Sequence, residues 1–250
     1  MDPQRADRSL QSTLGWAIDR MKEKGYAISA PVTLTVDPQL AIMGYAKKEG
    51  GTHRIVISAW ALDSEMLGGL VLHELAHIYF TEKRANSHNG KLFERVLGSL
   101  KEREGLRAKE VECLIDAFNH LQNILVDDIV FDIMPEKELK MARRFFGEWI
   151  SDKPSGDPVM DTALLCRNCF AIASLKRRKL FEEKTETYFR NKAFLSAMGG
   201  SSEKDFDWLE SFLEQSKPRS EERDFEKDLE DYFDKILSMM RASSRMDDLK

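Results

Sequence analysis

Apolar and polar positions repeat with two different periods along the chain, and the period predicts the elements. Residues 8–24 carry apolar side chains at helical spacing. Residues 32–36 alternate and are β-branched, which predicts a strand. Residues 41–46 and 54–58 flank Gly50-Gly51, which predicts a hairpin turning at these glycines.

The remaining pattern is helical. Residues 64–80 form the most apolar predicted helix, with Asp63 or Ser64 as its N-cap. Later segments with apolar spacing near 3.6 are 91–102, 108–133, 136–150, 158–175, 180–198, 204–216 and 221–241. The order predicts an α+β domain with a small antiparallel sheet over residues 1–150, then a mostly helical C-terminal region over residues 151–250.

Composition narrows the class of protein. The chain has 250 residues, of which 42% are apolar and 32% charged, as in soluble globular proteins. A net charge of -5 gives no reason to expect nucleic-acid binding. The polar start does not resemble a signal peptide, and no apolar run is long enough to span a membrane. Three cysteines suit a reducing compartment, so we expect a cytoplasmic protein.

Three polar residues interrupt the apolar helix at 64–80. His73 and His77 are four residues apart and share one helix face, with Glu74 beside them. Burying such groups without partners costs roughly 1–3 kcal/mol each. Two neutral imidazoles one turn apart can bind a single Zn²⁺, which removes that cost. The alternative is that they are core histidines satisfied within the protein.

The segment His73-Glu-Leu-Ala-His77 resembles the signature of zincin metallopeptidases. The order of strand 54–58, short loop and helix is also similar to that family, over residues 30–133. The resemblance implies a zincin-like domain, with Zn²⁺ on both histidines and Glu74 activating a zinc-bound water. It also implies that the last strand, 54–58, is an edge strand that binds substrate as an added strand.

A catalytic zinc site usually takes a third protein ligand. Lys83 stands where metzincins need a third histidine, so that subclass is excluded. We favour Asp127, because 123–127 resembles the Asn-x-x-x-Asp element of small gluzincin-like families. Glu112 is the alternative suggested by thermolysin-like enzymes, and His88 is the one suggested by a weaker resemblance to SprT-like proteases.

The resemblance therefore implies a zinc-dependent metallopeptidase that hydrolyses peptide bonds in a peptide or protein substrate. The alternative is a catalytically silent zincin-fold protein with a binding or regulatory role; the presence of Glu74 favours the enzyme. His120, Tyr79 and Arg143 are candidates for stabilising the oxyanion, and the sequence does not select among them.

Two further features lie in the C-terminal half. Cys166 and Cys169 form a lone CxxC without a second ligand pair, so we predict core cysteines. The last helix carries an apolar stripe that we expect to pack on other helices. Two sharper hypotheses are that residues 219–250 plug the zinc cleft, or that the C-terminal helices join a homodimer. The stripe comprises Phe225, Leu229, Tyr232, Phe233, Ile236, Leu237 and Met240.

Overall fold

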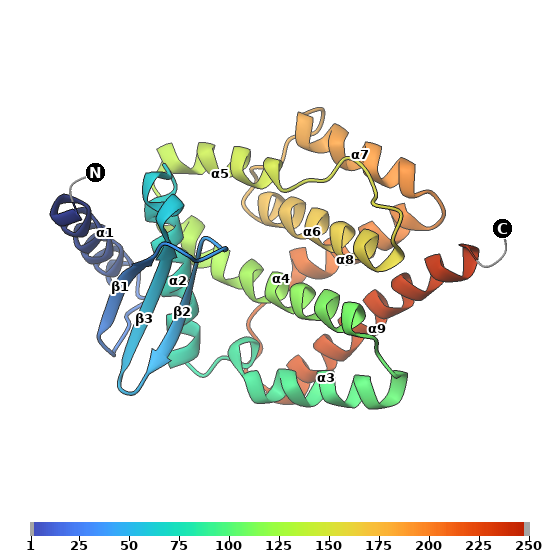
Figure 1. The fold of residues 1–250 in the computed structure, drawn as a ribbon, viewed down its shortest axis with the longest axis horizontal. Coiled ribbons are helices and arrows are strands. Elements are labelled where there is room, and N and C mark those ends of the chain that lie inside the picture. Colours follow the sequence, from blue (N-terminus) through green and yellow to red (C-terminus); the bar gives the residue numbers. More distant parts are fainter. Residues whose placement is uncertain (1–2, 248–250) are drawn as a thin grey trace. The chain divides into compact units, whose positions relative to one another are not determined.

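The computed structural model describes residues 3–247 and shows an α+β chain (Figure 1). By contacts between residues the chain divides into two compact units. The first comprises residues up to His88 together with Val126–Ala142, and the second comprises Asn89–Leu125 together with residues from Arg143 onward. These units differ from the predicted division at residue 150, which stays a prediction about independent domains.

The first unit holds the sheet and the helix that carries the two histidines. The predicted helix at 8–24, the strand after Pro31 and the hairpin at Gly50-Gly51 are all present. The elements are α1 Pro3–Glu23, β1 Val32–Asp37, β2 Gly44–Glu49, β3 Thr52–Ser58, the 3₁₀ turn η1 Ala59–Asp63, α2 Leu67–Glu82 and the 3₁₀ turn η2 Asn86–His88.

The sheet is mixed rather than antiparallel, which corrects the prediction. Its order is β1-β3-β2, with β1 parallel and β2 antiparallel to β3. The strand at 54–58 is therefore central, and its prediction as an edge strand is wrong. The reason is the run Ile55-Val56-Ile57, which is buried at every position. A strand of this kind lies inside a sheet, with neighbouring strands at both edges. The edge strand next to α2 is β2.

Both long helices of this unit lie along one face of the sheet (Figure 1). The end of α2 is tied to the sheet by Glu82, whose carboxylate accepts hydrogen bonds from the backbone N–H groups of Ser29 and Ala30 at 2.7 and 2.9 Å. Glu82 also lies 3.2 Å from Nε2 of His53. Burial alone would raise the pKa of Glu82, but these backbone hydrogen bonds hold it below its usual value. This contact fixes where α2 sits.

The second unit is helical. Its elements are α3 Gly90–Glu104, the first part of α4 Ala108–Ile133, the last part of α5 Glu136–Glu148, α6 Pro158–Arg177, α7 Glu186–Met198, α8 Ser202–Gln215 and α9 Glu222–Asp247. Helix α7 begins later than predicted, because Thr185 caps it by accepting a hydrogen bond from the N–H of Tyr188. Among the described residues, no helix is both long and apolar enough to cross a membrane.

The apolar stripe of α9 is buried within the second unit. All seven side chains predicted to form it, Phe225 to Met240, belong to the core. Helix α9 packs on α3, α6 and α8, as expected for a stripe that covers other helices. The plug and the homodimer stay predictions, and either would have to use the remaining, polar surface of this helix.

Candidate functional site

Helix α2 presents its polar residues from an apolar, buried body. Most of its side chains from Val71 to Phe80 are buried, while His73 and His77 are half-buried. The predicted N-cap at Asp63 or Ser64 is wrong, because the residue before the first turn is Met66. Ser64 lies two residues earlier and accepts a hydrogen bond from the N–H of Met66 at 3.1 Å. The helix is closely covered at Gly69, where a Cβ would lie 2.8 Å from the side chain of Met134. The helix is therefore held firmly behind the histidines.

Three imidazoles and a carboxylate form one chain of contacts. His73 Nδ1 lies 3.1 Å from Oδ1 of Asp127, and His73 Nε2 lies 3.2 Å from Nε2 of His77. His77 Nδ1 lies 2.9 Å from Nε2 of His88, whose Nδ1 lies 3.0 Å from the hydroxyl of Ser87. Burial lowers the pKa of His88 to about 4, so its ring is neutral at pH 7. The structure thus gathers residues from α2, η2 and α4.

The series of contacts from Asp127 to Ser87 is compatible with two arrangements of protons, with the heavy atoms in the same positions. In the first, His88 donates to His77, and His77 donates from Nε2 to His73. In the second, His77 donates from Nδ1 to His88, and His88 donates to Ser87. The first arrangement is that of core histidines satisfied within the protein. The second turns the Nε2 lone pairs of His73 and His77 towards each other.

The second arrangement fits a zinc ion. Two nitrogen ligands at 2.0–2.1 Å from a tetrahedral zinc ion are separated by about 3.3 Å, and the two Nε2 atoms are 3.2 Å apart. Each ring also has an outer partner on Nδ1, as zinc-bound histidines usually do. The buried Oδ2 of Asp127 accepts no hydrogen bond from any described residue. Among the described residues, however, no group of three His, Cys, Asp or Glu side chains is arranged to hold a metal ion.

Glu74 lies against the edge strand β2. Its side chain is almost fully buried, and it accepts a hydrogen bond from the N–H of Ala46. Burial raises the pKa of Glu74, which makes its carboxylate a better proton acceptor. A Cβ at Gly44 would lie 3.6 Å from Oε1 of Glu74. Hydrophobic patterning did not predict this role of β2, and the small residues Gly44 and Ala46 are the signal for it in the sequence.

The structure also places the other candidates for the third ligand. Asp127 contacts the nitrogen of His73 opposite to the one that faces His77. His88 likewise contacts the outer nitrogen of His77. Glu112 lies in the second unit and is exposed. Along α4 the surroundings therefore change from the exposed Glu112 to the buried Asp127.

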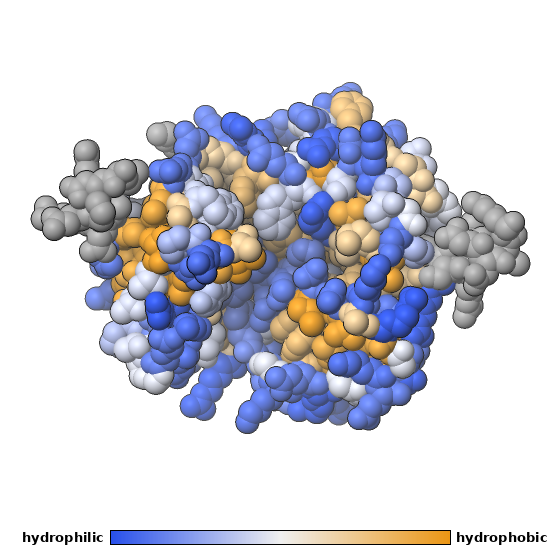
Figure 2. All heavy atoms as spheres, in the orientation of Figure 1, coloured by the Kyte–Doolittle hydropathy of each residue, from blue (hydrophilic) through white to orange (hydrophobic). Residues whose placement is uncertain are grey.

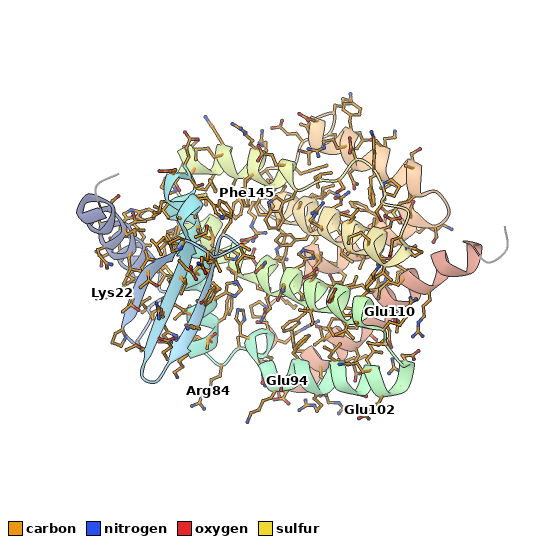
Figure 3. All side chains as sticks on the ribbon, in the orientation of Figure 1. Lys22, Arg84, Glu94, Glu102, Glu110 and Phe145 are labelled. Atoms are coloured by element: carbon orange, nitrogen blue, oxygen red, sulfur yellow. The ribbon has the colours of Figure 1, made fainter. Side chains whose placement is uncertain are left out.

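The three oxyanion candidates have different surroundings. Tyr79 lies on α2 and packs edge-on against the ring of Tyr26, with centroids 5.4 Å apart. His120 and Arg143 belong to the second unit. His120 stacks on Phe170, and Arg143 forms an ion pair with Glu182 at 2.7 Å. Only Tyr79 among the three shares a helix with the paired histidines. Figure 3 draws the side chains on the ribbon, and Arg84, which is labelled just after α2, points away from it.

The cysteines lie in the core of the second unit, as expected for structural residues. Cys113, Cys166 and Cys169 are free and buried. Burial raises the pKa of Cys113 to about 12 and those of Cys166 and Cys169 well above the usual value. These thiols are therefore protonated at pH 7, whereas metal binding and nucleophilic attack need the thiolate.

Comparisons with known proteins give one match. Neither a search of curated proteins nor a search of solved structures finds a protein that matches this chain. A family model matches residues 13–233, which covers the described elements from α1 into α9. The chain therefore belongs to the family of unknown function DUF5781.

Proposed function

We propose that this protein is a zinc-dependent metallopeptidase with a zincin-like first unit. The observation that carries the proposal is the pair of Nε2 atoms of His73 and His77, 3.2 Å apart on a buried helix. Both rings have partners on their outer nitrogens, so both Nε2 atoms can face one ion without moving the heavy atoms. A pair of purely structural histidines does not require this symmetry.

His73 and His77 would hold the zinc ion. When bound, zinc lowers the pKa of water towards about 7 and polarises a carbonyl group. The contacts favour Asp127 and His88 as groups that orient these rings, over the direct ligand role predicted from the sequence for Asp127. The buried negative charge of Asp127 would also be balanced by the cation, since its Oδ2 lacks a donor among the described residues.

Glu74 would act as the general base. Its carboxylate is buried beside His73 on the same helix, and it is held by the N–H of Ala46. From there it takes a proton from the attacking water and can pass it to the leaving amine. On either side of the Ala46 N–H that Glu74 holds, the open edge of β2 offers the outward backbone groups of Gly44 and Lys48, to which an extended peptide can add as a strand.

The test combines metal content with cleavage. Purified protein loaded with Zn²⁺ should hold one ion per chain by elemental analysis and should cleave casein or a quenched peptide. A chelator should abolish cleavage. The Glu74→Gln variant should keep its zinc and lose roughly 100-fold to 10,000-fold in kcat, as expected for removal of a general base.

Glu82→Gln is the matched control. It makes the same chemical change on the same helix, at a carboxylate that the structure gives a positioning role. It should lower the melting temperature and leave kcat per folded molecule close to that of the parent. Cleavage by Glu74→Gln at the parent rate would overturn the mechanism, and zinc binding without any cleavage would favour the catalytically silent alternative.

A further inference from the structure

The edge strand β2 has a hydrogen-bonded neighbour on one side only, because the sheet order is β1-β3-β2. The backbone carbonyl of Met43 points towards β3, because it accepts a hydrogen bond from the N–H of Ser58 at 2.9 Å. Along an antiparallel strand, the backbone N–H and C=O groups of successive residues point alternately to its two edges. The backbone groups of Gly44, Ala46 and Lys48 therefore face the open edge, and the hydrogen bond from Ala46 to Glu74 agrees with this.

The same three residues share one face of the sheet. The Cβ position of Gly44 points towards Glu74, so the side chains at 46 and 48 also lie on the face that carries α2. Lys48 is exposed on this face. Lys47 points to the opposite face, where it forms an ion pair with Glu49 at 2.6 Å. Along this edge, the small residues Gly44 and Ala46 lie beside Glu74, and the positively charged side chain of Lys48 comes next.

The other end of this edge is apolar. Ile42 and Trp60 are each 55% exposed. The pairing of Met43 with Ser58 brings the chain at Ile42 next to the start of η1, where Trp60 lies. In Figure 2, apolar side chains gather on the visible face around the end of the sheet where residues 38–43 join β1 to β2.

We propose that this edge selects extended peptides with a large apolar side chain against Ile42 and Trp60 and an acidic side chain opposite Lys48. Ile42, just before β2, and Lys48 are six residues apart, which is about 20 Å in an extended chain. This specificity rests on the proposed peptidase function, because Glu74, the proposed general base, lies beside Gly44 and Ala46 in the middle of the edge. It names the substrate class that the site would take.

A second copy of this chain fits the edge less well. If two β2 strands paired antiparallel about Ala46, each Lys48 would lie near the Gly44 and Ile42 end of the other strand. A cation would then meet an apolar side chain at both ends. A peptide with separate apolar and acidic residues matches both ends at once.

The experiment uses the full, zinc-loaded chain and quenched fluorogenic peptides of about twelve residues, long enough to span the strand. The parent peptide carries Phe and Glu six positions apart. Replacing its Phe by Ser should lower kcat/KM by about 10–200-fold, and replacing its Glu by Lys by about 3–10-fold, because the charge is exposed. The double variant Ile42→Ser/Trp60→Ala should reduce the Phe-to-Ser ratio to below about threefold.

Two further arms separate this inference from the proposed function. Binding of labelled peptides to zinc-loaded Glu74→Gln protein, measured by fluorescence anisotropy, should show the same preference for Phe over Ser without any cleavage. Phe189→Ala removes an equally exposed aromatic ring from α7 in the second unit and should leave the ratio unchanged.

The outcomes are distinct. Absence of cleavage with preferential binding would overturn the peptidase and keep the specificity. Cleavage with equal rates for the Phe and Ser peptides would overturn the specificity and keep the peptidase. A change from dimer to monomer in Ile42→Ser/Trp60→Ala on size-exclusion chromatography, with an unchanged peptide ratio, would assign the surface to contact between copies and overturn the inference.

Discussion

Helices α2 and α6 carry the same kind of sequence signal with different structural results. Each is a buried helix with two metal-binding residue types about one turn apart, His73 and His77 in α2 and Cys166 and Cys169 in α6. In α2 the two side chains face each other with 3.2 Å between their Nε2 atoms. In α6 the thiol of Cys169 donates a weak hydrogen bond to the carbonyl of Phe206, at 3.7 Å.

The difference lies in what surrounds each pair. Asp127 and His88 contact the outer nitrogens of the α2 histidines, and these contacts can fix the rings for a shared ion. The α6 cysteines lie in an apolar core that raises their pKa and keeps them protonated. Spacing on a helix therefore brings two groups together, while the outer partners determine whether they can act as ligands.

The largest effect is expected from a substitution that removes one histidine of the His73–His77 pair in α2. His77→Ala removes one of two imidazoles facing the same point, so zinc affinity should fall by about 1,000-fold or more, a loss of roughly 4 kcal/mol. Competition against a chromophoric chelator measures this. Cys166→Ala is the matched change in α6 and should leave zinc affinity at the parent value. Equal losses in both variants would mean that zinc binding does not depend on this site.

Much of the fold could be predicted from the sequence because the local signals are strong. The hairpin at Gly50-Gly51 follows from its glycines, one of which, Gly50, adopts φ 61°. The bounds of α4 match the prediction because its apolar side is continuous core. The order of strands could not be predicted, since the parallel pairing of β1 with β3 depends on contacts between distant residues.

For the candidate site, too, the local motif could be predicted from the sequence and the contacts between distant residues could not. His73, Glu74 and His77 follow from one local motif, and the structure brings Asp127 and His88 to the histidines. Their contacts with the outer nitrogens could not be read from spacing, because they depend on how α4 and η2 meet α2. The hydrogen bond from the N–H of Ala46 to Glu74 is also a tertiary contact, so the periodicity of the sequence does not predict it.

The second prediction concerns His120, a half-buried histidine in the second unit. His120 stacks on Phe170, and its buried Nδ1 has no hydrogen-bond partner in the described part of the chain. Burial lowers its pKa to about 4. The unfolded chain, with an ordinary value near 6.5, therefore binds more protons between these values, so stability should be lost as pH falls from about 6.5 to about 4.

The His120→Phe variant tests this loss. It keeps the stacked ring and removes the titrating group, so its stability should fall less with acid than that of the parent, by at most about 3 kcal/mol. Urea unfolding at pH 7 and at pH 4.5 gives the comparison. The same pH dependence in both proteins would show that His120 does not titrate in its buried position.

The smallest effect concerns the outer partner of His73. Asp127→Asn keeps an oxygen that can accept from Nδ1 and removes the negative charge, so zinc affinity should fall by about 10–100-fold. Asp128→Asn makes the same change at the next residue of α4, which is half-buried, and should have a much smaller effect. Chelator competition at one pH compares the two variants. A loss of about 1,000-fold or more for Asp127→Asn, equal to that of His77→Ala, would instead make Asp127 a direct ligand, because only a ligand removes that much binding free energy. An unchanged affinity would mean that the contact with Asp127 does not orient His73, and α2 would then differ from α6 only in the residues it carries.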